Sequence, residues 1–289
     1  MKTINDKAQN NITIAGKLLD ATFTKGSKDG RPYERFNLTV RVSQKYLGVD
    51  ETSEIPVSGI VSQFTKNGAP NPAYASLQQL KNFKTVQNCG FAEADSIKIT
   101  RGSISENNFM SRSGNLINGW QIRTTYVNKS EAKDIASFLI DIFIMDMKEE
   151  LDKDETPTGR LIIKGGIVQY DSSLSVLEFI VEDPQCVEYI SSNWNINDTV
   201  YIKGRIRYTS TEVNSTTGSS WGEDVPDTST RTVRELIITT GSDEPYDEDS
   251  AYDPVEIKKA FNIRKANIEQ LQAQKVAPKQ AKTTSGWDD

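Results

Sequence analysis

Alternating apolar and polar positions between residues 31 and 43 give the clearest strand signal in the chain. Phe36, Leu38, Val40 and Val42 fall on one face, because successive side chains of a strand point to opposite sides. The other face carries Arg31, Tyr33, Arg35, Asn37, Thr39 and Arg41. Cations and an aromatic ring opposite a buried face suit a polyanion whose bases stack, which describes single-stranded nucleic acid. An ordinary half-buried strand with a solvated outer face fits the same pattern.

The same alternation predicts four further strands and one short helix in the first half of the chain. We expect the strands at residues 11–24, 52–63, 95–104 and 116–127. The helix follows the proline-rich residues 70–72, where Leu77, Leu80 and Phe83 recur at helical spacing. Two polar loops join these elements: residues 25–31, which are turn-rich and basic, and residues 105–115, which hold an aromatic and an arginine.

The second half repeats this order of elements. Strands are expected at residues 136–148, 160–168, 174–182, 198–208 and 232–240, with a helix at 184–194 between the third and fourth. Residues 136–148 also fit an amphipathic helix, but their isoleucine content and the β-rich run after them favour a strand. Three strands, a helix and two strands make the element order of the OB-fold, a five-stranded barrel that binds oligonucleotides on strands 2 and 3 and loops 1-2 and 4-5. An SH3-like barrel and a chance alignment of strands are the alternatives; the repeated helix position favours two OB-folds in tandem and a mainly β protein.

The net charge of −6 is divided unevenly along the chain. Residues 1–129 carry 17 Lys and Arg against 10 Asp and Glu, residues 130–242 carry 10 against 20, and residues 243–289 carry 7 against 10. We therefore expect a basic OB domain at 1–129 as the main nucleic-acid site, an acidic OB domain at 130–241 and an acidic tail at 242–289. Drift of charge along the chain is the alternative explanation.

Composition argues against several kinds of site. The chain has no histidine, and its two cysteines, Cys89 and Cys186, lie far apart. His-dependent triads and most zinc sites are thereby excluded, and we expect two reduced thiols in a cytoplasmic protein. The longest apolar run is too short for a membrane span, which takes about 20 residues. The acids at residues 152–155 surround a lysine in a predicted turn, so we expect no enzymatic, metal or cofactor site.

Candidate nucleic-acid-binding residues follow from this arrangement. In the first domain they lie on the second strand, in the two loops and on neighbouring strands: Lys25, Lys28, Arg31, Tyr33, Arg35, Asn37, Arg41, Lys98, Phe109, Arg112, Trp120 and Arg123. Trp120 shares the parity of Ile122 and fits the barrel core at least as well. In the second domain, Lys203, Arg205 and Arg207 share one face of a strand. That face is expected to be a secondary DNA contact or an interface between the barrels.

The composition changes after residue 242. Residues 243–256 hold seven acids and no base, which is typical of a solvated linker. Apolar positions then predict an exposed helix at 254–276, and the remaining residues are disordered in composition and end in Trp287, Asp288 and Asp289. A short aromatic and acidic tip fits a basic pocket with an apolar floor, so these three residues are candidates for binding a partner. A passive solubilising tail is the alternative.

Several strings in the second domain and the tail resemble the tandem-OB single-stranded-DNA-binding proteins of bacteriophages, particularly phages of Gram-positive hosts. They are Thr158-Gly-Arg-Leu-Ile, Arg234-Glu-Leu-Ile-Ile-Thr, Asp243-Glu-Pro-Tyr, Tyr252-Asp-Pro and Ile257-Lys-Lys-Ala. The resemblance implies a non-enzymatic protein of the host cytoplasm that coats single-stranded DNA during phage replication or recombination. It also implies an acidic C-terminus that recruits replication or recombination proteins. Cellular single-strand binders end in acids followed by Pro-Phe, whereas here the acids follow Trp287. An OB-fold interaction scaffold of a replication or virion assembly, without strong DNA binding, is the alternative.

Overall fold

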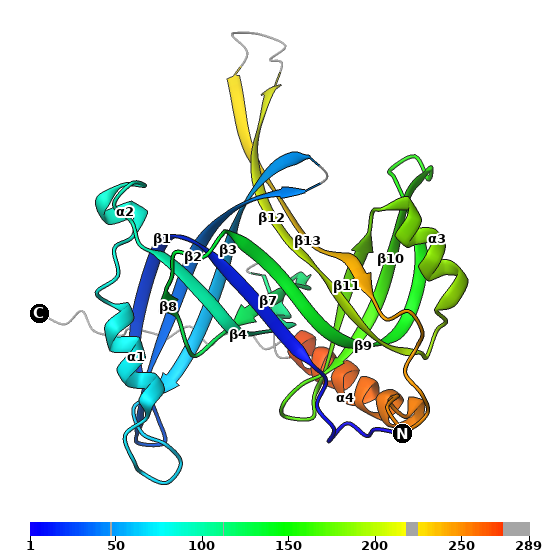
Figure 1. Cartoon of the computed structure of the whole chain (residues 1–289), viewed down its shortest axis with the longest axis horizontal. Helices are drawn as coiled ribbons and strands as arrows, with labels where there is room; N and C mark the ends of the chain where they lie inside the picture. Colours follow the sequence, from blue (N-terminus) through cyan, green and yellow to red (C-terminus); the bar gives the residue numbers. More distant parts are fainter. Residues whose placement is uncertain (47, 112, 218–224, 274–289) are drawn as a thin grey trace, which may run out of the picture.

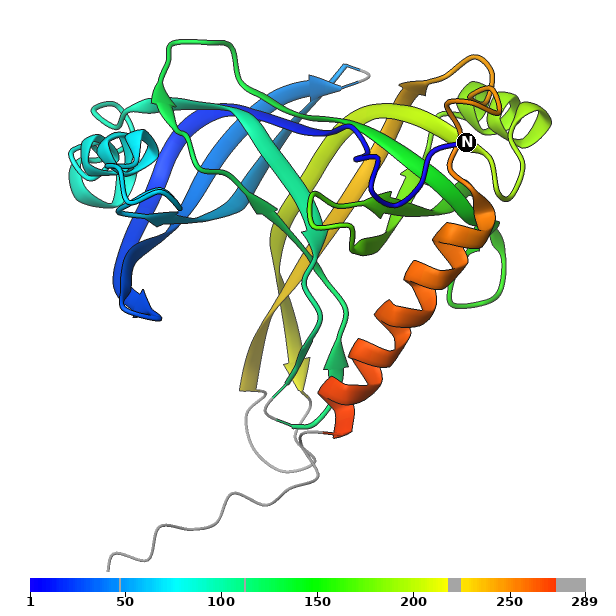
Figure 2. The same cartoon turned by 90° about the horizontal axis from the view of Figure 1, so that it is seen from below.

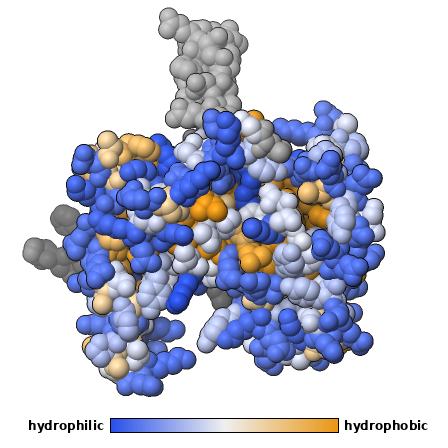
Figure 3. All heavy atoms as spheres, viewed as in Figure 1, coloured by the Kyte–Doolittle hydropathy of each residue, from blue (hydrophilic) through white to orange (hydrophobic). Residues whose placement is uncertain are grey.

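The chain is a mainly β structure with few helices, as its sequence predicts. The computed structural model describes residues 1–46, 48–111, 113–217 and 225–273. Within these residues, eleven strands form one sheet in the order β10-β11-β13-β12-β9-β1-β2-β3-β7-β4-β8, and β5 pairs with β6 (Figure 1). On the face shown in Figure 3, apolar residues gather toward the middle of the molecule and polar residues cover the periphery.

The elements have the following bounds. The strands are β1 (Asn10–Lys28), β2 (Arg31–Tyr46), β3 (Val49–Ser62), β4 (Ser96–Glu106), β5 (Phe109–Met110), β6 (Leu116–Ile117), β7 (Trp120–Arg123), β8 (Asn128–Lys129), β9 (Ile135–Leu151), β10 (Pro157–Val168), β11 (Leu174–Val181), β12 (Thr199–Thr217) and β13 (Val225–Gly241). The helices are α1 (Pro72–Leu80), α2 (Val86–Cys89), α3 (Pro184–Asn193) and α4 (Pro254–Ala273).

Five strands of the first half pair in a closed cycle, which we call the first ring. β1 pairs antiparallel with β2 and β4, β2 with β3, and β4 with β7. β3 and β7 are parallel and complete the cycle. α1 and α2 lie between β3 and β4 in the chain, as predicted for the first helical segment.

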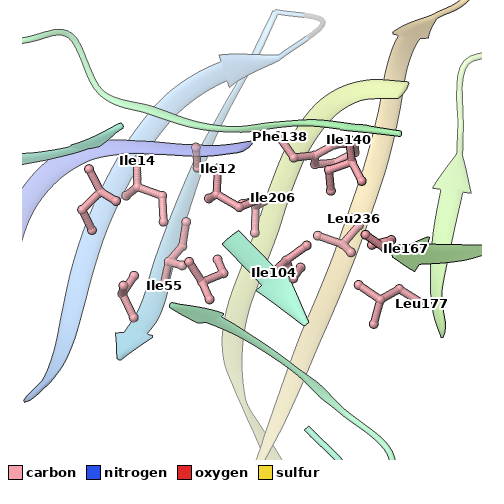
Figure 4. Packing of buried hydrophobic residues seen from close by; sticks show 14 of the residues in the cluster. Ile12, Ile14, Ile55, Ile104, Phe138, Ile140, Ile167, Leu177, Ile206 and Leu236 are labelled. Carbon is pink, nitrogen blue, oxygen red and sulfur yellow. The ribbon is translucent and has the colours of Figure 1, made fainter. Parts of the chain in front are cut away.

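The strands β9, β10, β11, β13 and β12 repeat this pairing, and we call them the second ring. β9 pairs with β10 and β12, while β11 and β13 are parallel. The strand predicted at residues 136–148 is confirmed as part of β9. Residues 10–15 of β1 pair with β9 and join the two rings. One apolar core therefore runs through both, from Ile14 and Ile55 to Leu177 (Figure 4).

Two loops of the first ring differ from their predicted form. Asp29 and Gly30 have φ values of 51° and 73°, and they alone separate β1 from β2. A two-residue turn with both φ values positive matches the twist of the flanking strands, so the strands continue to Lys28 and from Arg31. The predicted polar loop at 105–115 instead contains β5, which forms a hairpin with β6. The strand predicted at 116–127 is thereby shortened to β7.

The helix predicted at 254–276 is confirmed as α4. The tail after residue 242 nevertheless packs on the second ring through Tyr252 and one face of α4, which the predicted solvated linker and exposed helix did not include. Tyr252 is 2% exposed, and its hydroxyl donates to the backbone oxygen of Asp6 at 2.5 Å. Burial, with Asp141 and Asp6 nearby, raises the pKa of this hydroxyl. Ile257 of α4 joins Tyr252 in a second apolar cluster with Phe143, Val168, Leu174 and Val176. Figure 2 shows α4, in orange and red, beside the second ring and reaching the β5–β6 hairpin.

We predict that Ile257→Ala lowers the free energy of unfolding by about 2–5 kcal/mol, because it removes a side chain that is 2% exposed. Ile263→Ala, the same change on the same helix at a side chain that is 60% exposed, should change it by less than about 0.5 kcal/mol. Urea unfolding of both variants measures the difference. Equal losses, or none in either variant, would contradict the packing of α4 on the second ring.

Candidate nucleic-acid interface

The outer face of the first ring is built from rows of paired residues on β1, β2 and β3. Directly opposed residues of antiparallel strands share a face. The rows are Gly26, Tyr33 and Ser62, then Thr24, Arg35 and Ile60, then Thr22, Asn37 and Ser58. Arg123 of β7 pairs with Ser58 and extends the last row. The inward residues of β2 between these rows are buried, so the alternation predicted for residues 31–43 is confirmed.

The ring of Tyr33 lies directly over β1. A Cβ atom on Gly26 would stand 2.5 Å from Cζ of that ring, so the ring occupies this place only because residue 26 is glycine. The guanidinium of Arg35 is 5.4 Å from the ring centroid, which is within cation–π range. Ile60, 48% exposed, lies beside Arg35 in the next row. An aromatic surface, a cation and an apolar side chain therefore adjoin one another on the outer face.

The acid between Tyr33 and Arg35 serves the structure and points inward. Glu34 is 1% exposed; it accepts a hydrogen bond from Nε2 of Gln78 at 3.2 Å and lies 2.7 Å from Nζ of Lys81. Burial raises the pKa of Glu34, but hydrogen bonds from Lys81 and Gln78 outweigh it, and the pKa lies below its ordinary value. This ion pair connects the end of α1 to the first part of β2.

Four predicted cationic site residues lie at or near the β1–β2 turn: Lys25, Lys28, Arg31 and Arg35. Lys28 and Arg31 pair across the turn and are exposed with Arg35 on the outer face. Lys25 pairs with Glu34, so it shares the opposite face of the sheet. The structure therefore brings together three of these four cations and separates Lys25 from them.

The other predicted residues of the first half are spread over its surface. Phe109 is 48% exposed on the β5–β6 hairpin, which contacts α4. Trp120 is half-buried and meets Tyr208 of β12 edge-on, with 6.2 Å between ring centroids, so it belongs to the packing between the rings. Lys98 lies half-buried on β4. Arg112, Trp287, Asp288 and Asp289 lie outside the described residues.

Arg205 and Arg207 take part in an ion-pair cluster between the rings. Arg205 is 6% exposed; it donates to Glu51 of β3 and, at 2.6 Å, to Glu182. Arg207 donates to Glu51 at 2.7 Å. The ring of Tyr46, at the end of β2, covers Arg205 with 3.8 Å between the guanidinium carbon and the ring centroid. Of the two roles expected for this face, the geometry fits an interface between the rings. Lys203, on the same strand, is exposed.

Phe91 is a surface aromatic that the sequence patterns did not single out. It follows α2, is 49% exposed, and lies between Lys17 and Arg41, 6.0 and 5.6 Å from its ring centroid. Arg41 also pairs with Glu54 at 2.5 Å. A lone aromatic among residues 87–93, which include no other large apolar side chain, is the signal that could have marked it.

The corresponding outer face of the second ring has a different character. There, Lys164 of β10 pairs with Asp146 on one side and Glu178 on the other, so the row is acidic overall. The end of this face, at Phe143 and Val176, is covered by α4. The basic and open face is therefore that of the first ring.

Across residues 1–46, 48–111, 113–217 and 225–273, no His, Cys, Asp or Glu group is arranged to hold a metal ion. Cys89 is exposed and Cys186 half-buried, and both are free thiols. None of the described helices is both long and apolar enough to cross a membrane.

Comparison with known proteins gives the chain a family and its fold a likeness. The YorF family model matches residues 8–274, so the chain belongs to the YorF family. The wild-type single-stranded DNA binding protein from Thermus aquaticus matches with a TM-score of 0.54 at 9% sequence identity, covering 83% of this chain and 95% of that chain. This likeness concerns the fold alone, and it is consistent with the OB type that such proteins have.

Two further comparisons support no conclusion about fold or function. A replication protein A heterotrimer bound to ssDNA matches 80% of this chain and 50% of that chain at 11% identity, but its TM-score of 0.25 is too low for a structural conclusion. No curated protein matches the sequence.

We predict that Glu34→Gln makes the fold less stable and less sensitive to acid. The folded-state pKa of Glu34 lies below its ordinary value of 4.5. The ionised carboxylate therefore stabilises the fold at pH values above 4.5, and this contribution is lost as the pH falls through the folded-state pKa. The variant should lose about 1–3 kcal/mol at neutral pH. It should then lose less than the wild type on acidification, as measured by urea unfolding at neutral and acid pH.

The control for this prediction is Glu54→Gln, on the neighbouring strand. The Glu54 side chain is 47% exposed, and exposed ion pairs contribute about 0–1 kcal/mol to the free energy of unfolding. Glu54→Gln should therefore change that free energy by no more than this amount. Parallel pH profiles for the Glu34 variant and the wild type would contradict a structural role for the buried ion pair.

Proposed function

We propose that this YorF-family protein binds single-stranded DNA, largely independently of sequence, on the outer face of its first ring. The observation that carries the proposal is the line of outward-facing residues Arg31, Tyr33, Arg35 and Asn37 along β2, a strand whose other face is buried in the core. Exposed cations fit phosphates, and the Tyr33 ring fits the face of a base. Stacking accepts any base, because every base has a π face. The likeness to a single-stranded DNA binding protein supports the proposal at the level of fold.

We further propose that the two rings are OB barrels in tandem, with the divisions 1–129 and 130–241 expected from the sequence. The closed strand pairing and the helical segment between the third and fourth strands of each ring support this division. The second barrel has an acidic outer face partly covered by α4. Its role in the proposal is to support the first barrel through β9 and the Arg205 cluster.

The biological setting belongs to the proposal as well. The strings at 158–162 and 234–239 resemble phage single-strand binders, which supports a part in phage DNA replication or recombination. Recruitment of replication proteins through Trp287, Asp288 and Asp289 rests on composition alone. Tyr252, Ile257 and Ala260 fix the first part of the tail to the second ring, so the proposed recruiting segment is the tip that follows α4.

We predict that the double variant Arg31→Gln/Arg35→Gln binds oligo-dT more weakly and with a smaller salt dependence. Each phosphate contact to a single strand contributes about 0.7 to the slope of log affinity against log salt, so the slope should fall by about 1.4. Fluorescence anisotropy over a salt series measures both quantities.

The matched control is Lys148→Gln/Lys164→Gln on the outer face of the second ring, which should leave the slope unchanged. Equal losses in the two double variants would contradict the first ring as the main site. Failure of the wild type to bind oligo-dT would contradict the proposed function and favour an interaction scaffold.

We predict that Tyr33→Ala weakens binding by about 1–3 kcal/mol at low and high salt alike, because base stacking releases no counterions. Gly26→Ala should give a similar loss, since its Cβ would displace the Tyr33 ring. The combined variant should be no weaker than Tyr33→Ala alone, and Tyr33→Phe should bind nearly as the wild type. An additional loss from Gly26→Ala in the absence of the ring would show that Gly26 acts through the backbone instead.

A further inference from the structure

We infer that the nucleic-acid track continues along β2, over Phe91, into a lysine-lined pocket at the junction of the two rings. This inference rests on the proposed function and extends its site. The pocket, about 440 Å³ in volume, is lined by Thr13, Gln44, Lys45, Lys98 and residues 132–135, which include Lys133. Its ligand would be the phosphates of nucleotides that lie beyond Phe91, at the end of the track opposite Tyr33.

Strand parity connects the pocket to the outer face already described. Lys45 has the same parity as Arg31, Arg35 and Arg41, so it continues their line on β2. Arg41 pairs with Lys17 on β1. The pocket begins next to this pair of residues. Its lining residue Lys98, on β4, pairs with Ala15 of β1, which lies two residues before Lys17. At about 3.3 Å per residue, Tyr33 and Lys45 are up to about 40 Å apart along the strand.

Phe91 supplies an aromatic surface between the two ends of this line. Its ring is 49% exposed, with Arg41 on β2 and Lys17 on β1 as its cationic neighbours. A base stacked on Phe91 would have its phosphates near these two cations. The arrangement repeats that of Tyr33 with Arg35, an aromatic ring beside a cation on the same outer face.

The charge of the pocket favours an anion. Lys45, Lys98 and Lys133 form no ion pair within the described residues, whereas nearby Lys129 pairs with Asp95 at 2.7 Å. Asp134 also lines the pocket, and its carboxylate accepts the backbone N–H of Ser43 at 2.8 Å. Three ammonium groups and one carboxylate, which is already hydrogen-bonded, leave the lining with a positive balance. Phosphate contacts of this kind dominate affinity for nucleic acid.

The test measures affinity against oligonucleotide length in the full chain. Oligo-dT of about 5 to 25 nucleotides spans the range from part of one site to more than one OB-fold site. For Lys98→Gln/Lys133→Gln, affinity for the shortest oligonucleotides that bind should equal that of the wild type, and affinity for the longest should fall about tenfold at low salt. Phe91→Ala should lower affinity from intermediate lengths upward at every salt concentration. Lys258→Gln/Lys265→Gln, two exposed lysines of α4, is the matched control and should bind as the wild type.

The outcomes separate this inference from the proposed function. If the wild type and the Lys98/Lys133 variant bind equally at every length, while Arg31→Gln/Arg35→Gln binds weakly, the pocket is not part of the track and the proposed function stands. If the loss is the same for the shortest and longest oligonucleotides, the pocket is not the distal end of the track and the inference fails. If the wild type binds no oligonucleotide, both fail. The melting temperatures of all variants, whose substituted side chains are exposed or half-buried, should match that of the wild type.

Discussion

The pairing of β1 along both of its edges is the constraint on which the rest of the structure depends. One edge pairs with β4, and the other pairs first with β9 and then with β2. Gly16 lies where β1 changes its partner from β9 to β2. A Cβ there would lie 2.2 Å from the backbone oxygen of Arg41, so the close approach of β1 and β2 requires glycine at this position. Because a single strand closes the first ring and joins the second, the outer face of β2 is held in a fixed relation to both.

Burial and pairing separate the charges that hold the fold together from those left for a ligand. Glu34 with Lys81, and Arg205 with Glu51 and Glu182, are enclosed pairs that connect elements. Arg31 and Arg35 are exposed on the outer face. Charges beyond about 8 Å are screened at physiological ionic strength. The chain's net charge of −6 therefore does not oppose anion binding at a face where cations are concentrated.

Local patterns predicted the strands and the outward residues of β2, because alternation of apolar residues needs no knowledge of distant segments. The same reasoning could not pair Arg205 with Glu51, which lies 154 residues away in the sequence. It predicted the helix near residues 254–273 but missed the packing of the tail on the second ring, because seven acids dominate residues 243–256 while Tyr252 and Ile257 supply the buried contacts. It also missed Phe91, whose place between Lys17 and Arg41 depends on α2 and β1 meeting in space.

Ultraviolet cross-linking of oligo-dT to the full chain, followed by mass spectrometry of the cross-linked peptides, tests the central claim most directly. The claim is that single-stranded DNA lies on the outer face of the first ring. The account predicts cross-links in β2 around Tyr33 and, for long oligonucleotides, at Phe91. Cross-links confined to β9–β11 of the second ring, or none at concentrations where the chain binds the oligonucleotide, would contradict it.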